Sequence, residues 1–321
     1  MQSQEYGPSK WALGQRTESC SDETVEDAYV RGKLLRTHLL RPTWHSTTVD
    51  DIRWLLRLTS PRVEVQNGYP YRRLELDDRT LGRGKEVLAE ALRGGAHLTR
   101  PELAERLLDA GIATDGQRLA YIVMHAELAG LVCSGPRRGK QHTYALLDER
   151  APGPEGPSGE AALAELGLRF FTSHGPACAR DLAWWATLKV SDAKKAAALA
   201  GDRLDSFEFD GRTYWHGEIP EAGDDAAEAL LLPDYDETFV GYRSPRVSLR
   251  GRSEDMSAVF ERPVTIDGVS VANWKRKVEP KRIQVWLTAF SKLSRRETAA
   301  IDAAFERYEA FMGLPVTVQI G

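Results

Sequence analysis

Residues 81–148 contain a pattern that few folds can accommodate, three helices followed by a basic hairpin. Apolar residues recur at helical spacing over residues 81–92, 99–111 and 115–128. Thr99 and Glu102 form a T-x-x-E capping box at the start of the second helix. Two extended runs, 131–133 and 142–146, then flank a tip with the sequence GPRRGK. This order of elements predicts a winged-helix domain over residues 81–150.

The same pattern recurs after a linker. Residues 151–158 (APGPEGPS) have the composition of a linker. Ser191 is the expected N-cap of the third helix that follows, and Asp210 and Gly211 form a strong two-residue hairpin signal. Three helices and two strands are predicted, at residues 160–171, 177–187, 192–200, 204–209 and 213–216. They predict a second winged-helix domain over residues 151–228.

The first 80 residues predict a shortened winged-helix domain. Residues 24–39 and 49–58 have helical patterns, and residues 39–46 are compatible with an extended segment between them. A complete module should have a further helix in front, and the chain begins too late to supply it. We therefore expect an incomplete first winged-helix domain over residues 1–80.

The last part of the chain, residues 229–321, has a different pattern. Short β-rich runs are broken by Pro and Gly, and one helix is expected at residues 294–312. The expected strands are at residues 247–249, 264–266, 269–272, 283–287 and 316–320. The chain as a whole is predicted to be an α+β protein, with three tandem winged-helix domains followed by a C-terminal β-rich or barrel-like domain.

Composition excludes several classes of protein. The 321 residues are 42% apolar and 28% charged, which is ordinary for a globular protein. The sequence has no apolar run long enough for a membrane span or a signal peptide. Cys20, Cys133 and Cys178 are odd in number and widely spaced, and no His or Cys motif has metal-ligand spacing. We expect a cytoplasmic protein with no metal and no cofactor.

The charge distribution permits a surface that binds phosphate. The net charge is −4, but residues 241–282 hold ten Lys and Arg against five Asp and Glu. Arg243, Lys275 and Arg276 belong to this basic stretch. A local surplus of this kind fits contacts to nucleic acid, and it also fits a solvated charged surface.

Several clusters are compatible with nucleic-acid contacts. The tip at residues 135–140 lacks the spacing and the Ser or Thr of a phosphate-binding loop. It fits a wing that touches backbone phosphates, or an exposed basic turn without a ligand. Aromatic residues beside cations suit unstacked bases, and they equally suit core packing. The residues concerned are Arg137, Arg138 and Lys140 in the tip, Arg41 with Trp44 and His45, Trp184 with Trp185, and residues 274–277 (WKRK).

A group of carboxylates leaves a third possibility open. Asp234, Asp236 and Glu237 precede Arg243 by a few positions. Paired carboxylates can catalyse glycoside hydrolysis, and the same residues can form a structural ion-pair turn. Signatures of a serine hydrolase or of a dinucleotide-binding fold do not occur. From the residues alone, we expect a protein of several winged-helix domains that binds nucleic acid.

A family resemblance extends over almost the whole chain. Residues 41–45 (RPTWH) leading to residues 50–56 (DDIRWLL) resemble the R-x-T-x-H…D-L-x-W-L-L signature of the AlkZ/YcaQ-like winged-helix DNA glycosylases. The further matching segments are residues 130–132 (GLV), 174–185 (HGPACARDLAWW), 232–237 (LPDYDE), 241–243 (GYR) and 273–276 (NWKR). Their order and spacing together carry the resemblance.

The resemblance implies a fold, an activity and a catalytic pair. Members have tandem winged-helix domains and a C-terminal β-rich domain around a concave DNA channel. They excise alkylated bases, some including interstrand crosslinks, with a Gln-x-Gln element in one branch. Gln2 and Gln4 match that element, although Ser3 replaces the usual apolar middle residue. On this reading His45 would line the lesion site, and Trp44 and Arg41 would be among the residues that bind the lesion or the DNA.

The leading hypothesis is a monofunctional DNA glycosylase that acts on cationic N-alkylated purines. A cationic base leaves readily, so two amide oxygens that orient water and stabilise positive charge are sufficient. Glu5 is an alternative base. The partner would be alkylated or crosslinked double-stranded DNA, bound by a monomer. The rival hypothesis is a non-catalytic winged-helix DNA-binding or regulatory protein, and a hydrolase using the carboxylates at residues 234–237 is the third.

Overall fold

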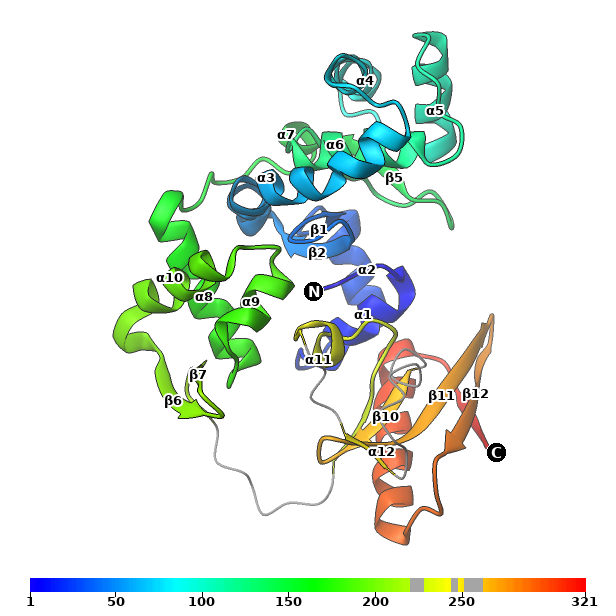
Figure 1. Ribbon diagram of the computed structural model, residues 1–321. Helices are drawn as coiled ribbons and strands as arrows, with labels where there is room; N and C mark the ends of the chain where they lie inside the picture. Colours follow the sequence, from blue (N-terminus) through cyan, green and yellow to red (C-terminus); the bar gives the residue numbers. More distant parts are fainter. Residues whose placement is uncertain (220–227, 244–247, 251–261) are drawn as a thin grey trace. The chain divides into compact units, whose positions relative to one another are not determined.

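The chain folds into two compact units, each described here by itself. The computed structural model describes residues 1–219, 228–243, 248–250 and 262–321 (Figure 1). One unit comprises residues 27–218, and the other comprises residues 1–26 together with residues 219–321. The structure is mixed α and β, as the sequence predicted, whereas the division into four domains stays a prediction. Arg246, Val247 and Arg252, which belong to the predicted strand and basic stretch, lie outside the described residues.

The larger unit opens with a hairpin that the sequence analysis missed. Helix α2 (Asp22–Val30) is followed by the antiparallel strands β1 (Leu34–His38) and β2 (Trp44–Thr48). The prediction of one helix over residues 24–39 was therefore wrong. Gly32 ends the helix with a φ of 73°, and Leu35 and Thr37 then lose all solvent exposure in the strand. Glycine adopts this backbone conformation at little cost.

Helix α3 (Val49–Arg73) runs 15 residues beyond the predicted end at residue 58. It passes through Pro61 and Pro70, which remove backbone donors and usually end a helix. Val63 and Tyr71 from its later turns are buried against apolar residues of α6 (Arg118–Leu128). This packing offsets the cost of the prolines, and periodicity alone could not show it.

The predicted helices and hairpin of residues 81–148 are confirmed. The capping box forms, with the Thr99 N–H donating to Glu102 Oε2 over 2.6 Å. Five leucine and isoleucine side chains without exposed surface form the centre of the core: Leu88, Leu92, Leu103, Leu107 and Ile122. The elements are α4 (Asp78–Leu92), β3 (Leu98–Thr99), α5 (Arg100–Asp109), α6, β4 (Val132–Ser134), β5 (Thr143–Leu146) and α7 (Leu147–Arg150).

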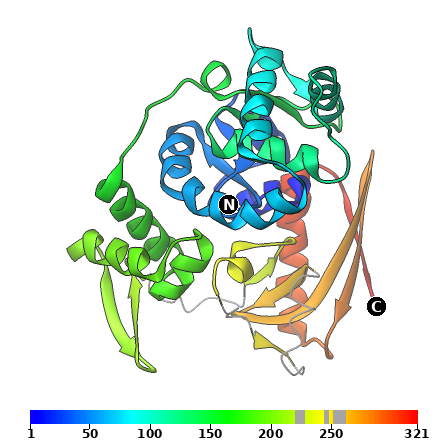
Figure 2. The same cartoon turned by 45° about the horizontal axis from the view of Figure 1, so that its top comes forward.

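Residues 159–216 also form the predicted three helices and hairpin. Asp210 and Gly211 both have positive φ at the turn, which suits a two-residue hairpin. Figures 1 and 2 show this hairpin extending away from the helices. The N-cap of the third helix is Lys189, so the prediction of Ser191 was wrong. The elements are α8 (Gly159–His174), α9 (Ala179–Trp185), α10 (Val190–Ala200), the 3₁₀ turn η1 (Gly201–Arg203), β6 (Asp205–Phe209) and β7 (Arg212–His216).

The smaller unit is built on a sheet with the strand order β13–β12–β11–β10–β8, and β9 pairs with β11. Strand β11 continues to Glu279 where residue 272 was the expected end, because β12 pairs with it from Ala289 to Arg282. No pairing among the described residues joins β8 to β13, so the barrel-like form is not confirmed. The elements are β8 (Ala229–Leu231), α11 (Glu237–Val240), β9 (Ser248–Leu249), β10 (Pro263–Ile266), β11 (Val269–Glu279), β12 (Arg282–Ala289), α12 (Arg295–Met312) and β13 (Val316–Ile320).

Helix α1 (Tyr6–Gly14) occupies the position where the sequence analysis expected no helix, and it belongs to this smaller unit. Trp11 packs on α12, with its ring centroid 4.9 Å from that of Tyr308 and 5.1 Å from that of Phe311. Gly7, Pro8 and Gly14 give α1 a poor intrinsic helix propensity, which is why the sequence did not indicate it. In the described part of the chain, no helix is long and apolar enough to cross a membrane.

Candidate functional site

Gln2 and Gln4, the predicted catalytic pair, lie in the folded part of the smaller unit. Gln2 is only 7% exposed, and its backbone N–H donates to Glu237 Oε1 over 2.7 Å. Ser3 is fully buried and Gln4 is half-buried. Glu5, the alternative base, is exposed at the N-cap of α1. The pair is therefore held at the start of a packed helix.

Helix α1 is fastened to the segment that carries Glu237. The Arg16 guanidinium donates to both carboxylate oxygens of Asp236, at 2.7 and 3.0 Å. Trp11 Nε1 donates to the Leu231 carbonyl oxygen over 2.7 Å. Charge-assisted bidentate pairs are among the stronger and more directional hydrogen bonds in proteins. These contacts fix the position of the residues that follow the Gln-x-Gln element.

Each carboxylate of residues 234–237 has a structural partner. Asp234 pairs with Arg262 over 2.6 Å. Asp236 accepts from Arg16 and also caps α11 through the Thr238 N–H, at 2.9 Å. Glu237 accepts from the Gln2 N–H. These contacts support the structural ion-pair interpretation over a hydrolase that uses the same carboxylates. They also identify Glu237 as a neighbour of the Gln-x-Gln element that the sequence analysis did not recognise.

Trp44 and His45 lie in the other unit, on β2. The centroids of the Trp44 and His38 rings are 4.5 Å apart. The Arg36 guanidinium lies 4.2 Å from the centroid of the Trp44 ring. His45 is fully buried, with Nδ1 2.9 Å from the Thr43 carbonyl oxygen. Trp44 therefore packs among cationic and aromatic neighbours. The role of these residues and of Arg41 at a lesion stays a prediction.

One arginine in the basic tip of the β4–β5 hairpin makes contacts within the protein. Arg138 donates to Glu102 Oε1 over 2.7 Å and to the His97 carbonyl oxygen over 2.8 Å. The Thr99 N–H and then Arg138 lower the pKa of the Glu102 carboxyl to about 2. Arg137 is half-buried, and Lys140 is exposed at the tip. Of the three predicted phosphate contacts, Arg138 and Lys140 are exposed, and Arg138 is already paired with Glu102.

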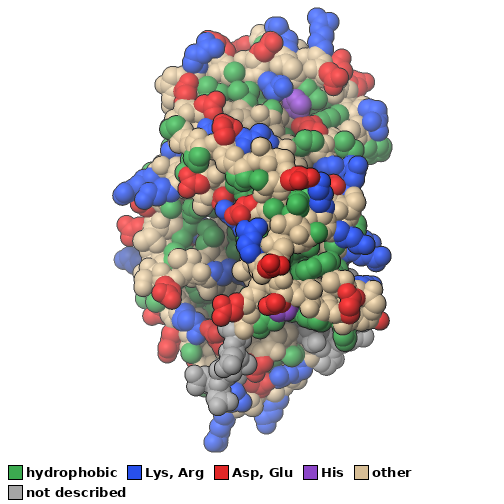
Figure 3. All heavy atoms as spheres, turned by 90° about the vertical axis from the view of Figure 1, so that its left-hand side faces the viewer, with side chains coloured by type: hydrophobic (Ala, Val, Ile, Leu, Met, Phe, Trp, Pro, Cys, Tyr) green, Lys and Arg blue, Asp and Glu red, His purple; other side chains and the backbone are tan. Residues whose placement is uncertain are grey.

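The segment 273–276 also divides between core and surface. Trp274 is 1% exposed and packs edge-on against Tyr308, with ring centroids 5.3 Å apart. The Arg276 guanidinium donates to the Tyr308 hydroxyl and lies 5.7 Å from the centre of the Trp274 ring. Lys275 and Arg243 are exposed. In the part of one face that is drawn in colour in Figure 3, Lys and Arg side chains are interspersed with Asp and Glu.

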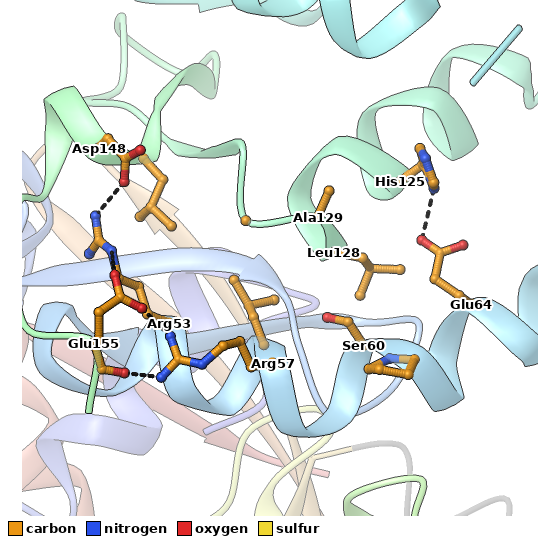
Figure 4. Close-up of a pocket in the computed structure, with 13 residues that line it drawn as sticks. Arg53, Arg57, Ser60, Glu64, His125, Leu128, Ala129, Asp148 and Glu155 are labelled. Carbon is orange, nitrogen blue, oxygen red and sulfur yellow. Dashed lines mark hydrogen bonds and ion pairs between the residues drawn. The ribbon is translucent and has the colours of Figure 1, made fainter. Parts of the chain in front are cut away.

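A cavity of about 480 Å³ opens beside α3 in the larger unit (Figure 4). Its cations are neutralised, since Arg53 pairs with Asp148 over 2.8 Å and Arg57 pairs with Glu155. His125 Nδ1 lies 2.9 Å from Glu64 Oε1 at its other end. The pairing of its arginines makes this cavity a poor site for a phosphate. Among the described residues, no three His, Cys, Asp or Glu side chains are placed to hold a metal ion.

Comparison with known proteins identifies the family of this chain. A solved structure with a similar fold is the Streptomyces sahachiroi DNA glycosylase AlkZ, with a TM-score of 0.77 and 18% sequence identity over 100% of this chain and 91% of that chain. None of the curated proteins compared with the sequence matches it. The family model described as "DNA glycosylase AlkZ-like" matches residues 1–311, which include Gln2, Gln4 and the segment that holds them. This chain therefore belongs to the AlkZ-like family of DNA glycosylases.

Proposed function

We propose that this protein is a monofunctional glycosylase of the Gln-x-Gln branch that removes cationic N-alkylated purines from double-stranded DNA. The observation that carries the proposal is the placement of Gln2, which is 7% exposed and held through its backbone N–H by Glu237. A catalytic dipole is effective only when its position is fixed before the reaction. Gln4 follows two residues later, directly before the exposed Glu5 and helix α1.

The chemistry suits amide side chains. The bond between C1′ and the purine nitrogen breaks, and the electron pair leaves with a base that its positive charge has already activated. The oxygen of a water molecule forms the new bond to C1′ and loses a proton to solvent. Oriented amide oxygens stabilise the positive charge on the sugar and position the water without titrating. Unmodified purines need protonation by an acid, and we expect them to remain intact.

The decisive experiment compares neighbouring residues. In single-turnover assays on duplex DNA containing N7-methylguanine, we expect Gln4→Ala to abolish release of the base. Glu5→Gln, the matched control one position away, should leave the rate unchanged. The wild-type rate should be nearly flat between about pH 6 and 9, because no titrating group is involved. No release by the wild-type protein, or an equal loss in both variants, would overturn the proposal.

The same assays test the finer parts of the proposal and the rival hypothesis. A duplex with an interstrand crosslink in place of methylguanine tests whether crosslinks are also opened. DNA binding without release of any base would favour a non-catalytic regulatory protein. The exposed cations Lys140, Arg243 and Lys275 are the proposed phosphate contacts. We propose that the protein acts as a monomer and needs no cofactor.

A further inference from the structure

A second cavity in the larger unit is lined by neither Gln2 nor Gln4. It has a volume of about 440 Å³, within the range of about 300–1,000 Å³ that is usual for small-ligand pockets. The loop between β1 and β2, helix α3, helix α9 and the segment after α9 form its walls. The lining residues are Arg41, Pro42, Thr43, Arg62, Gln66, Ala183, Trp184, Thr187 and Leu188.

The wall of this cavity contains an exposed indole. Trp184 is 51% exposed, whereas its neighbour Trp185 packs 5.2 Å from Phe170 and 5.3 Å from His174 between ring centroids. The Trp-Trp pair thus divides into one residue that supports the fold and one that faces the cavity. Small-ligand pockets are lined mainly by apolar and aromatic side chains, so an exposed indole in the wall of a cavity fits a binding surface.

The polar groups of the cavity favour an anionic ligand. Arg41 and Arg62 supply two guanidinium groups, and no described residue of the lining is acidic. The Nε–H of Arg62 and the Oγ1 of Thr43 are buried and have no hydrogen-bond partner among the described residues. A buried polar group without a partner costs about 1–3 kcal/mol, which a ligand can recover. The lining of the cavity beside Arg53 and Arg57 differs, since it includes the acidic residues Asp148 and Glu155, which pair with those arginines.

We propose that this cavity binds one unpaired nucleotide of DNA, with its base stacked on Trp184 and its phosphate bound by Arg41 and Arg62. The indole accepts the π-face of any base, and guanidinium groups bind phosphate with two parallel hydrogen bonds. Thr43 and Gln66 provide hydrogen-bonding groups for the base edge or the sugar. The inference rests on DNA being the substrate of the proposed function, and it does not depend on catalysis by Gln2 and Gln4.

The test measures the affinity of the full-length protein for three labelled DNAs by fluorescence anisotropy. These are a fully paired duplex, the same duplex with one bulged nucleotide, and a short oligo-dT strand. We expect Trp184→Ala to weaken binding of the bulged duplex and of oligo-dT about 10-fold, since stacking contributes about 1–3 kcal/mol per base. Affinity for the paired duplex should be unchanged, and Trp184→Phe should retain most of the preference.

Two controls separate the possible outcomes. Leu108→Ala, at a site of similar exposure on α5 (55%), should change none of the three affinities. Gln4→Ala should bind the bulged duplex as tightly as the wild type. Equal weakening of all three DNAs by Trp184→Ala, or no weakening, overturns the nucleotide site while leaving the glycosylase proposal intact. If the wild-type protein binds none of the DNAs and releases no base, both proposals fail.

Discussion

Glu237 provides the sharpest prediction at the scale of single residues. Its carboxylate accepts a hydrogen bond from the Gln2 N–H over 2.7 Å. In the Glu237→Gln variant, the amide oxygen of the new side chain can accept the same hydrogen bond. Glu237→Leu instead removes this acceptor from the buried Gln2 N–H, and the loss of an acceptor from a buried donor costs about 1–3 kcal/mol. We expect Glu237→Leu to lower the single-turnover rate about 10-fold and Glu237→Gln to stay within about 3-fold, since about 1.4 kcal/mol corresponds to a factor of ten.

The affinity for DNA should be the same in both variants, because Glu237 is proposed to position Gln2 and not to contact DNA. If Glu237→Gln is as slow as Glu237→Leu, the negative charge itself takes part in the reaction, and the proposed role of Glu237 is wrong. No spacing rule could reveal this contact, since the two residues are 235 positions apart in the chain. The candidate pair Gln2 and Gln4 was accessible from the sequence only through the family resemblance.

The cysteines give a second prediction at this scale. Burial raises the pKa of the Cys133 thiol to about 12, whereas Cys20 is partly exposed. The thiolate is the reactive form, so Cys133 should remain almost unmodified by iodoacetamide at pH 8 while Cys20 reacts. Peptide mass spectrometry after a short labelling pulse measures both rates in one sample. Equal labelling of the two cysteines in the folded protein would contradict the buried position of Cys133.

At the scale of elements, Glu102 connects the start of α5 to the tip of the β4–β5 hairpin. It accepts the Thr99 N–H at 2.6 Å and pairs with Arg138 at 2.7 Å, and these contacts hold its pKa at about 2. The ordinary value is 4.5, so the carboxylate contributes stability that is complete above about pH 4.5 and is lost as the pH falls through about 2. Glu102→Gln cannot titrate and lacks this contribution.

We therefore expect the Tm of Glu102→Gln to lie below that of the wild type at pH 7, with the difference shrinking between about pH 4.5 and 2. Calorimetry at a series of pH values measures it. Glu105→Gln, on the same helix, is the control for removing a carboxylate that is not part of the capping box. A difference that stays constant over this range would mean that the ion pair and the cap do not stabilise the hairpin tip.

The elements that the sequence predicted well share a local cause. Residues 81–148 and 159–216 have capping residues, glycine stops and an Asp-Gly turn, and each signal acts over a few positions. Where tertiary packing decided, prediction failed. Helix α3 continues through Pro61 and Pro70 because its later turns are buried. Helix α1 forms despite its low helix propensity because Trp11 packs on α12. Strands β11 and β12 are longer than predicted because they pair with each other along their length.

At the scale of the whole molecule, the unexpected feature is a discontinuous unit. Residues 1–26 belong with residues 219–321, and residues 27–218 form the unit between them in sequence. The sequence analysis assigned the first 80 residues to one domain because it used patterns between residues that are close in the chain. Such patterns cannot show that residues 1–26 pack with residues 219–321. The contacts of Trp11, Arg16 and Gln2 with residues 231–237 show how the N-terminal segment is built into the unit.

Trp11 offers a test of whether this unit gains its stability from the N-terminal segment. Its side chain is 4% exposed, packs edge-on against Tyr308 and at a tilt against Phe311, and donates to the Leu231 carbonyl oxygen. Removing a buried tryptophan side chain costs about 3–5 kcal/mol. Hydrogen exchange of Trp11→Ala should therefore show a large loss of protection in β11 and β12 and little change in α5 and α6, which belong to the other unit. The exposed Trp184→Ala should change neither, and an equal loss in both units would show that they unfold together.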